Sequence, residues 1–204
     1  MTSHRHNSES ESLGSTESTP RDGYLDAARE CILDVGWRRT TLTEVARRAG
    51  VSRMTIYRAW SDMPALLADL MTREWGSLVA GRVDAATPPT PGSIADTVVA
   101  TVGALRENEL FTRIVELDPE LILPYLLARR GRSQELILEV LGVAIATGQD
   151  DGAIRAGAPA AIARGLLLAA HGYVLSAHTM VDDVVDESTL ETELHTLVVR
   201  SLQP

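Results

Sequence analysis

The segment from Thr41 to Trp60, TLTEVARRAGVSRMTIYRAW, constrains the fold of this chain most, because it predicts two short helices joined by a tight turn. Its first half has apolar residues at the spacing of a helix with one buried face: Leu42, Val45, Ala46 and Ala49. Gly50 follows, where the end of a helix favours a residue that adopts positive φ. Ser52 then stands at an N-cap position, since its hydroxyl can accept a backbone N–H of the next turn. The pattern predicts a helix-turn-helix.

The second helix of this segment divides its side chains between two faces. Ile56, Ala59 and Trp60 form an inward stripe, which leaves the other positions to face outward. A helix docked in the major groove of DNA needs one face for its own domain and another that presents hydrogen-bond donors. Arginine forks onto guanine edges or phosphates, and hydroxyls anchor phosphates. The residues expected to contact DNA are Arg21, Thr41, Thr43, Ser52, Arg53, Met54, Thr55, Tyr57 and Arg58.

Basic residues are concentrated in the same segment. Between Arg38 and Arg58 the chain has six arginines and one glutamate, although its formal net charge is −9. An acidic bulk disfavours indiscriminate adhesion to nucleic acid, while a local basic patch still attracts it. The alternative is an ordinary helical hairpin with a solvated basic face. The glycine turn, the serine cap and the outward hydroxyls favour the DNA-binding interpretation.

The segment resembles the DNA-binding domain of the TetR family of bacterial transcriptional regulators. The matching residues are Thr40, Thr41, Leu42, Val45, Ala46, Ala49, Gly50, Val51, Ser52, Thr55, Ile56, Tyr57 and Trp60. Residues 27–36 resemble the first helix of the family, and Leu66 and Leu67 match the start of its long connecting helix. In one departure, Met63 stands near the position where the family commonly places a lysine that reaches a phosphate.

Composition and periodicity predict an all-α fold. The chain is 45% hydrophobic and 4% aromatic, its apolar residues are mainly Leu, Val, Ala and Ile, and no strand-type alternation is sustained. We expect a polar, disordered tail over 1–20, a three-helix helix-turn-helix DNA-binding domain over 21–63, and a larger helical effector-binding and dimerisation domain over 64–204. The predicted helices outside the helix-turn-helix are 21–34, 64–83, 93–106, 109–116, 119–131, 133–147, 159–181 and 188–202, with Asp118 as an N-cap.

The family resemblance implies a cavity among the middle helices, where a small effector binds and lowers the affinity for DNA. The residues expected to line it are Trp75, Phe111, Ile114, Tyr125, Leu141, His171 and Val174. An apolar lining with a few polar groups suits a mainly hydrophobic ligand. For each residue the alternative is plain core packing. His171 and His178 lie seven residues apart, which is wider than the usual spacing of helical metal ligands, and we expect neither metal nor cofactor.

The last two predicted helices indicate a homodimer. The helix from Pro159 is apolar around more of its circumference than one core face requires, so it needs cover on two sides. Packing with the last helix and a symmetry mate would form a four-helix interface and hold two recognition helices about 34 Å apart, as two half-sites of a palindrome require. The alternative is a buried helix in a monomer. Its most apolar run, residues 165–181, is short for a membrane span, and we expect no membrane association.

These patterns favour a homodimeric transcriptional repressor that responds to an effector. An enzyme with a helical core is an alternative, but the sequence lacks a nucleophile elbow, a phosphate-binding glycine loop and a His–Glu metal motif. A partner-binding protein without DNA binding is another. Cys31 is the only cysteine, so no intrachain disulfide forms, and a cytoplasmic location is expected. Cys31 is interpreted as a small core residue, with redox sensing as the alternative.

Overall fold

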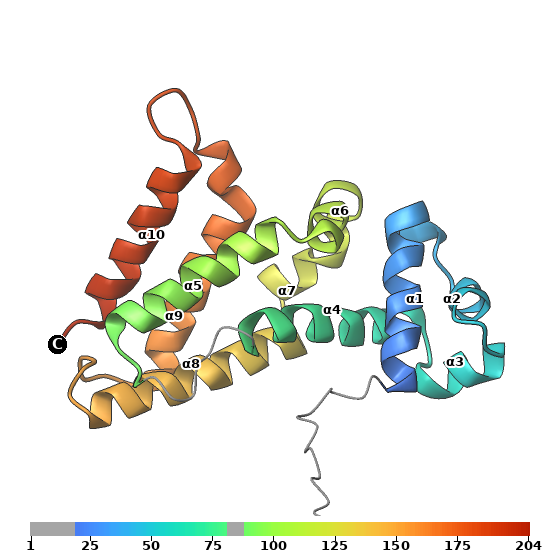
Figure 1. Ribbon diagram of the computed structural model, residues 1–204, viewed down its shortest axis with the longest axis horizontal. Helices are drawn as coiled ribbons and strands as arrows, with labels where there is room; N and C mark the ends of the chain where they lie inside the picture. The colour runs from blue at the N-terminus through green and yellow to red at the C-terminus, as the bar shows by residue number, and fades with distance from the viewer. Residues whose placement is uncertain (1–18, 81–87) are drawn as a thin grey trace, which may run out of the picture.

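The computed structural model describes residues 19–80 and 88–204, which contain helices and no strand (Figure 1). The α-helices are α1 (Pro20–Val35), α2 (Leu42–Arg48), α3 (Arg53–Ala59), α4 (Met63–Ala80), α5 (Pro91–Arg106), α6 (Glu109–Leu117), α7 (Leu123–Leu127), α8 (Arg132–Asp150), α9 (Pro159–Ser176) and α10 (Glu187–Leu202). Short 3₁₀ turns are η1 (Trp37–Arg39), η2 (Pro119–Leu121) and η3 (Ala177–Thr179). The all-α prediction is confirmed. Most of the predicted tail and the end of the predicted fourth helix lie outside the described residues.

The first core joins the helix-turn-helix to the start of α4. Its fully buried side chains include Ala28, Ile32, Val45, Ile56, Leu66, Leu70, Leu110 and Ile114. Thr19 caps α1 in a reciprocal capping box with Asp22. Cys31 is buried in this core, as predicted. Because Leu66 and Leu70 belong to α4, the first core continues past the predicted boundary at residue 63.

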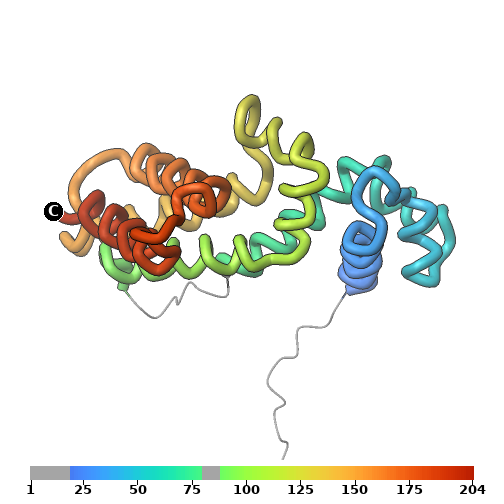
Figure 2. The backbone as a smooth tube through the Cα atoms, turned by 90° about the horizontal axis from the view of Figure 1, so that it is seen from above, coloured from blue at the N-terminus to red at the C-terminus, as the bar shows by residue number. Residues whose placement is uncertain are grey.

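The second core lies at the other end of the molecule. It is built from α5, α8, α9 and α10, and its buried residues include Ile94, Val98, Val102, Ile145, Leu166, Leu194, Val198 and Leu202. Figure 2 shows α1 to α3 at one end and α9, α10 and the C-terminus at the other. The helix α4 runs between the two ends and packs on α1, α5 and α8. A movement of α4 would therefore change the packing of both cores.

Two predicted helices are wrong in detail. The helix expected over 119–131 is divided into η2 and the short α7, each of which begins at or next to a proline. Asp118 stands at the N-cap position of η2, as predicted, but its side chain makes no cap bond there, because its buried carboxylate accepts the backbone N–H of Trp37 at 3.3 Å. The long apolar helix ends at Ser176 and continues only as η3.

Candidate nucleic-acid interface and effector cavity

The turn between α2 and α3 is set by local backbone chemistry. Gly50 has a φ of 68°, and the N–H of Val51 donates to the carbonyl of Ala46 at 3.0 Å, which closes the end of α2. A side chain at Gly50 would meet no atom within 4 Å, so the positive φ, and not lack of space, accounts for the glycine. Ser52 caps α3 by accepting the N–H of Thr55 at 3.2 Å. These local contacts confirm the predicted helix-turn-helix.

The outward face of α3 is open to solvent. Ile56 and Trp60 are buried against the first core, whereas Tyr57 is 48% and Met54 is 62% exposed. Arg53 and Arg58 are also exposed, and neither has an ion-pair partner within residues 19–80 and 88–204. On α2, the N-cap Thr41 and its neighbour Thr43 are exposed at the same end of the chain as α3. The arrangement presents hydroxyls and unengaged guanidinium groups together.

Three of the six arginines between Arg38 and Arg58 form ion pairs with acidic side chains. Arg47 pairs with Glu44 at 2.6 Å, and Arg48 pairs with Asp34 at 2.5 Å. Arg38 reaches the carboxylate of Glu120 at 2.6 Å, outside the helix-turn-helix. Only Arg39, Arg53 and Arg58 lack an ion pair in the described part of this segment. The surface with unpaired positive charge is therefore smaller than the six arginines of this segment indicate, and it is centred on α3.

Arg21 was predicted to contact DNA, and the structure gives it another role. Its guanidinium pairs with Asp69 of α4 and lies over the ring of Trp60, with 4.5 Å between Cζ and the ring centroid. The indole Nε1–H of Trp60 also donates to Asp69, at 2.8 Å. Arg21 thus holds the end of α3 to α4 while its side chain stays 50% exposed, and its contact with DNA stays a prediction. Asp62 caps α4 by accepting the N–H of Ala65 at 2.8 Å.

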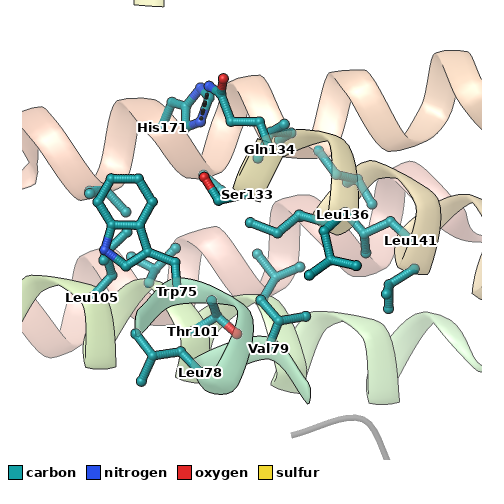
Figure 3. Close-up of a pocket in the computed structure, with 18 of the residues that line it drawn as sticks. Trp75, Leu78, Val79, Thr101, Leu105, Ser133, Gln134, Leu136, Leu141 and His171 are labelled. Atoms are coloured by element: carbon teal, nitrogen blue, oxygen red, sulfur yellow. Dashed lines mark hydrogen bonds between the residues drawn. The ribbon is translucent and has the colours of Figure 1, made fainter. Parts of the chain in front are cut away.

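A cavity of about 940 Å³ lies among α4, α5, α8 and α9, with α6 and α7 at one side (Figure 3). Six of the seven predicted residues line it: Trp75, Phe111, Tyr125, Leu141, His171 and Val174. Ile114 does not, and this prediction is wrong. It is fully buried in the first core, where α6 packs on α1, although it lies on the same apolar face of α6 as Phe111.

The polar groups of the cavity are few, and most of them were not predicted from the sequence. Gln134 at the start of α8 contacts His171 of α9, with 3.3 Å between their Nε2 atoms. Burial lowers the pKa of His171 below its ordinary value. Trp75 Nε1 and Thr101 Oγ1 are buried without a hydrogen-bond partner in the described residues. Helical periodicity marks these positions as inward-facing but does not distinguish a cavity wall from a packed core.

Asp69 links the cavity wall to the helix-turn-helix. Besides Arg21 and Trp60, its carboxylate accepts Nη1–H of Arg132 at 2.7 Å, and Arg132 is the first residue of α8 and borders the cavity. Burial raises the pKa of Asp69, but the hydrogen bonds from Arg21 and Trp60 and the charges of both arginines outweigh it and bring the pKa below its ordinary value. One ionised carboxylate therefore ties together α1, α3, α4 and α8.

Comparison with known proteins agrees with this geometry. Residues 25–70 match the family model described as bacterial regulatory proteins, tetR family. The uncharacterised HTH-type transcriptional regulator Rv2250c of Mycobacterium tuberculosis is 34% identical over 174 residues, which cover 83% of this chain and 87% of the relative. The transcriptional repressor QsdR of R. erythropolis, from the TetR family, has a TM-score of 0.63 at 15% identity, covering 90% of this chain and 94% of QsdR.

A second solved structure has the same fold and contains a ligand. The regulator FadR from Bacillus subtilis in complex with stearoyl-CoA has a TM-score of 0.61 at 17% identity, covering 88% of this chain and 97% of FadR. The relatives and the family are transcriptional regulators and not enzymes. On the matched helix-turn-helix and the similarity over most of its length, this chain belongs to the TetR family of bacterial transcriptional regulators.

Proposed function

We propose that this chain is a cytoplasmic, homodimeric repressor that binds a palindromic operator and is released from it by a mainly hydrophobic effector. In this proposal residues 21–63 read DNA, and residues 64–204 bind the effector and the second copy. The main support for this proposal is that α4 belongs to both parts of the molecule. The first half of this helix packs under the DNA-reading helices, and its second half lines the 940 Å³ cavity. A molecule that enters the cavity must act on the helix that supports α3.

The proposed DNA contacts use the exposed face of α3. Arg53, Tyr57 and Arg58 supply guanidinium and hydroxyl donors, and Ser52 and Thr55 lie at the N-terminal end of the same helix. Thr41 and Thr43 add hydroxyls from α2. Arg39 is exposed and unpaired within the described residues, so it extends the basic surface beside the turn. Met63 supplies no charge at the start of α4, which leaves phosphate binding to these groups.

The proposed dimer uses α9 and α10. By length and composition the segment Pro159–Thr179 could cross a membrane, although in this fold it packs on α5 and α8. Its outward face has Leu168, which is 71% exposed, between Gly165 and Gly172. A side chain at either glycine would meet no atom within 4 Å, so the backbone is open to close approach by another helix. A second copy would cover this apolar face, as two-fold dimers commonly do.

The proposed effector is mainly hydrophobic because the cavity walls are. Leu67, Met71, Val98, Val102 and Leu166 are buried around it, and its volume falls in the range of small-molecule sites. The complex of FadR with stearoyl-CoA is in line with this proposal as far as the long acyl chain of that ligand is concerned. Through the contacts of Asp69 with Trp60 and with Arg132, a ligand bound in the cavity can change the position of α3.

A gel-shift assay on the duplex DNA that flanks the gene of this protein tests the proposal. We expect a retarded complex whose affinity falls steeply as salt rises, because each neutralised phosphate releases counterions. Apolar small molecules that bind the cavity should release the DNA. A protein that binds none of these duplexes at low salt, in a folded state verified by circular dichroism, would overturn the repressor proposal and favour a partner-binding role.

A further inference from the structure

Among the residues that the structure describes, no charged side chain is buried inside the cavity. The charged residues along its lining, Asp96, Arg132 and Glu139, are exposed at its edge, and Arg132 is already paired with Asp69. The polar atoms inside belong to neutral side chains. A ligand with a net charge would therefore lose its hydration without gaining a partner of opposite charge. This observation restricts the ligand before any single contact is considered.

The amide of Gln134 has only one possible orientation. The backbone N–H of Gly131 lies 2.8 Å from Oε1, and a backbone N–H can only donate, so Oε1 is the acceptor. The backbone carbonyl of Tyr125 lies 3.2 Å from Nε2 and can only accept. Both contacts assign the oxygen and the nitrogen in the same way. The NH₂ group therefore donates one proton to Tyr125 and turns its other proton toward His171.

This orientation determines the tautomer of His171. An amide nitrogen does not accept hydrogen bonds, so at 3.3 Å the Nε2 atom of His171 must accept from Gln134 and has no proton of its own. The ring is therefore neutral, with its proton on Nδ1. The lowered pKa that burial gives His171 agrees with a neutral ring. Nδ1 has no hydrogen-bond partner among the described residues, and Figure 3 shows His171 and Gln134 together at the cavity.

We propose that the effector is an uncharged, mainly apolar molecule with a carbonyl oxygen that accepts the Nδ1–H of His171. A hydrocarbon of the same shape would leave this donor unpaired in an apolar site. A carboxylate would need a positive charge, which Gln134 opposes because its NH₂ group occupies the position of the second imidazolium proton. The inference concerns the ligand class of the cavity and rests on the proposed function for its regulatory meaning.

The tautomer is measurable in the unmodified protein. Long-range ¹H–¹⁵N spectra of the full chain at neutral pH distinguish a protonated ring nitrogen from an unprotonated one. We expect His171 to have a protonated Nδ1 and an unprotonated Nε2, with its signals assigned by their loss in His171→Phe. A ring protonated on Nε2, or on both nitrogens, would overturn the inference. This measurement is made on the protein without any bound ligand.

Three probes with the same carbon count test the ligand class: heptanophenone, heptylbenzene and phenylheptanoate. Displacement of an uncharged naphthylamine dye reports their affinities. The ketone should bind about tenfold more tightly than the hydrocarbon, which corresponds to one hydrogen bond to an otherwise unpaired donor, and the carboxylate should bind most weakly. His171→Phe should remove the preference for the ketone. The matched control His178→Phe changes an exposed histidine outside the cavity and should retain it.

The failure of this inference is distinguishable from that of the proposed function. Equal affinity for ketone and hydrocarbon, preference for the carboxylate, or an unchanged preference in His171→Phe would each overturn the inference. DNA binding and its release by apolar molecules would then still support the repressor. Conversely, a ketone preference that depends on His171, in a protein that binds no duplex, would support the inference and overturn the proposed function.

Discussion

At the scale of single residues, DNA recognition depends on which arginines are free. Arg38, Arg47 and Arg48 are each held by a carboxylate, so binding DNA would require them to exchange one partner for another. Arg53 and Arg58 are exposed and unpaired within the described chain, so their guanidinium groups can bind bases or phosphates without first breaking an ion pair. The energetic contribution of a surface arginine thus depends on its neighbours as much as on its position.

Replacing the free donors of α3 should weaken operator binding without unfolding the protein. Arg53→Ala removes a bidentate donor and should cost about 1–3 kcal/mol of binding free energy. Tyr57→Phe removes one hydroxyl and should cost about 1 kcal/mol. The measurement is the dissociation constant from a gel shift at fixed salt. Arg130→Ala removes the same charge outside the helix-turn-helix and serves as the control. Unchanged operator binding by both α3 variants would contradict the assignment of α3 as the helix that contacts DNA.

His171 should make stability depend on pH. Its folded-state pKa lies below its ordinary value, so as the pH falls below about 6.5 the unfolded chain binds a proton that the folded chain does not. The free energy of unfolding should therefore be unaffected by this group above that pH and decrease below it. Urea unfolding between about pH 7.5 and pH 5 measures the effect. The decrease should be smaller in His171→Phe, and an identical pH dependence in both proteins would contradict the assignment.

The sequence predicted those residues whose role is local. Gly50 and Ser52 act on their own turn, so spacing and residue type suffice to identify them. The contact of Arg21 with Asp69 was not predicted, because the two residues are far apart in sequence and no local pattern indicates it. Phe111 and Ile114 share one apolar stripe, yet one lines the cavity and the other fills the first core. Periodicity identifies the buried face of a helix, whereas the packing of other helices decides what that face meets.

At the scale of elements, α4 connects the two functions through Asp69. The side chains that meet at this carboxylate come from α1, from the end of α3 and from the start of α8. A ligand that displaces α8 would change the contact between Arg132 and Asp69. The same carboxylate holds the indole of Trp60, which is the residue that ends α3. We therefore expect the position of α3 to be coupled to the wall of the cavity.

Asp69→Asn tests this coupling with a small change in shape. The amide removes the negative charge that Arg21 and Arg132 share, which should destabilise the protein by about 2 kcal/mol. More specifically, the effector concentration that releases half of the DNA should rise, because a displacement of α8 is no longer transmitted to α3 through the ionised Asp69. Fluorescence anisotropy of labelled operator DNA, titrated with a cavity-binding probe, measures that concentration.

The control for Asp69→Asn lies on the same helix. Glu74 pairs with Arg29 and Arg73 and makes no ion pair with α8 among the described residues. Glu74→Gln should therefore reduce stability without changing the effector concentration needed for release. Equal shifts in release for the two variants would show that general loosening of α4, and not the Asp69 contacts, transmits the signal.

At the scale of the whole molecule, the two ends have different surfaces. The α3 end has exposed arginines, and the α9 end has an exposed leucine between two glycines with open space around them. Family membership alone does not specify which helix faces form a dimer in this chain. In this fold α5 and α8 pack on α9 and Leu168 stays exposed, which is why we propose that side of α9 for the second copy. Two copies joined there would place their DNA-reading ends on one assembly.

Leu168→Arg should convert the dimer to a monomer and weaken DNA binding strongly. The substitution is harmless on a free surface but buries an unpaired charge in a helix–helix interface, which costs several kcal/mol. A monomer loses the second half-site, and with it an affinity gain on the order of 10²–10⁴ from bivalent binding. Sedimentation equilibrium and a gel shift measure the two effects. Leu127→Arg is the matched control, because Leu127 is 79% exposed on α7, away from α9 and α10. If Leu168→Arg stays dimeric while Leu127→Arg dissociates, the subunits meet at a different surface and the four-helix interface is wrong.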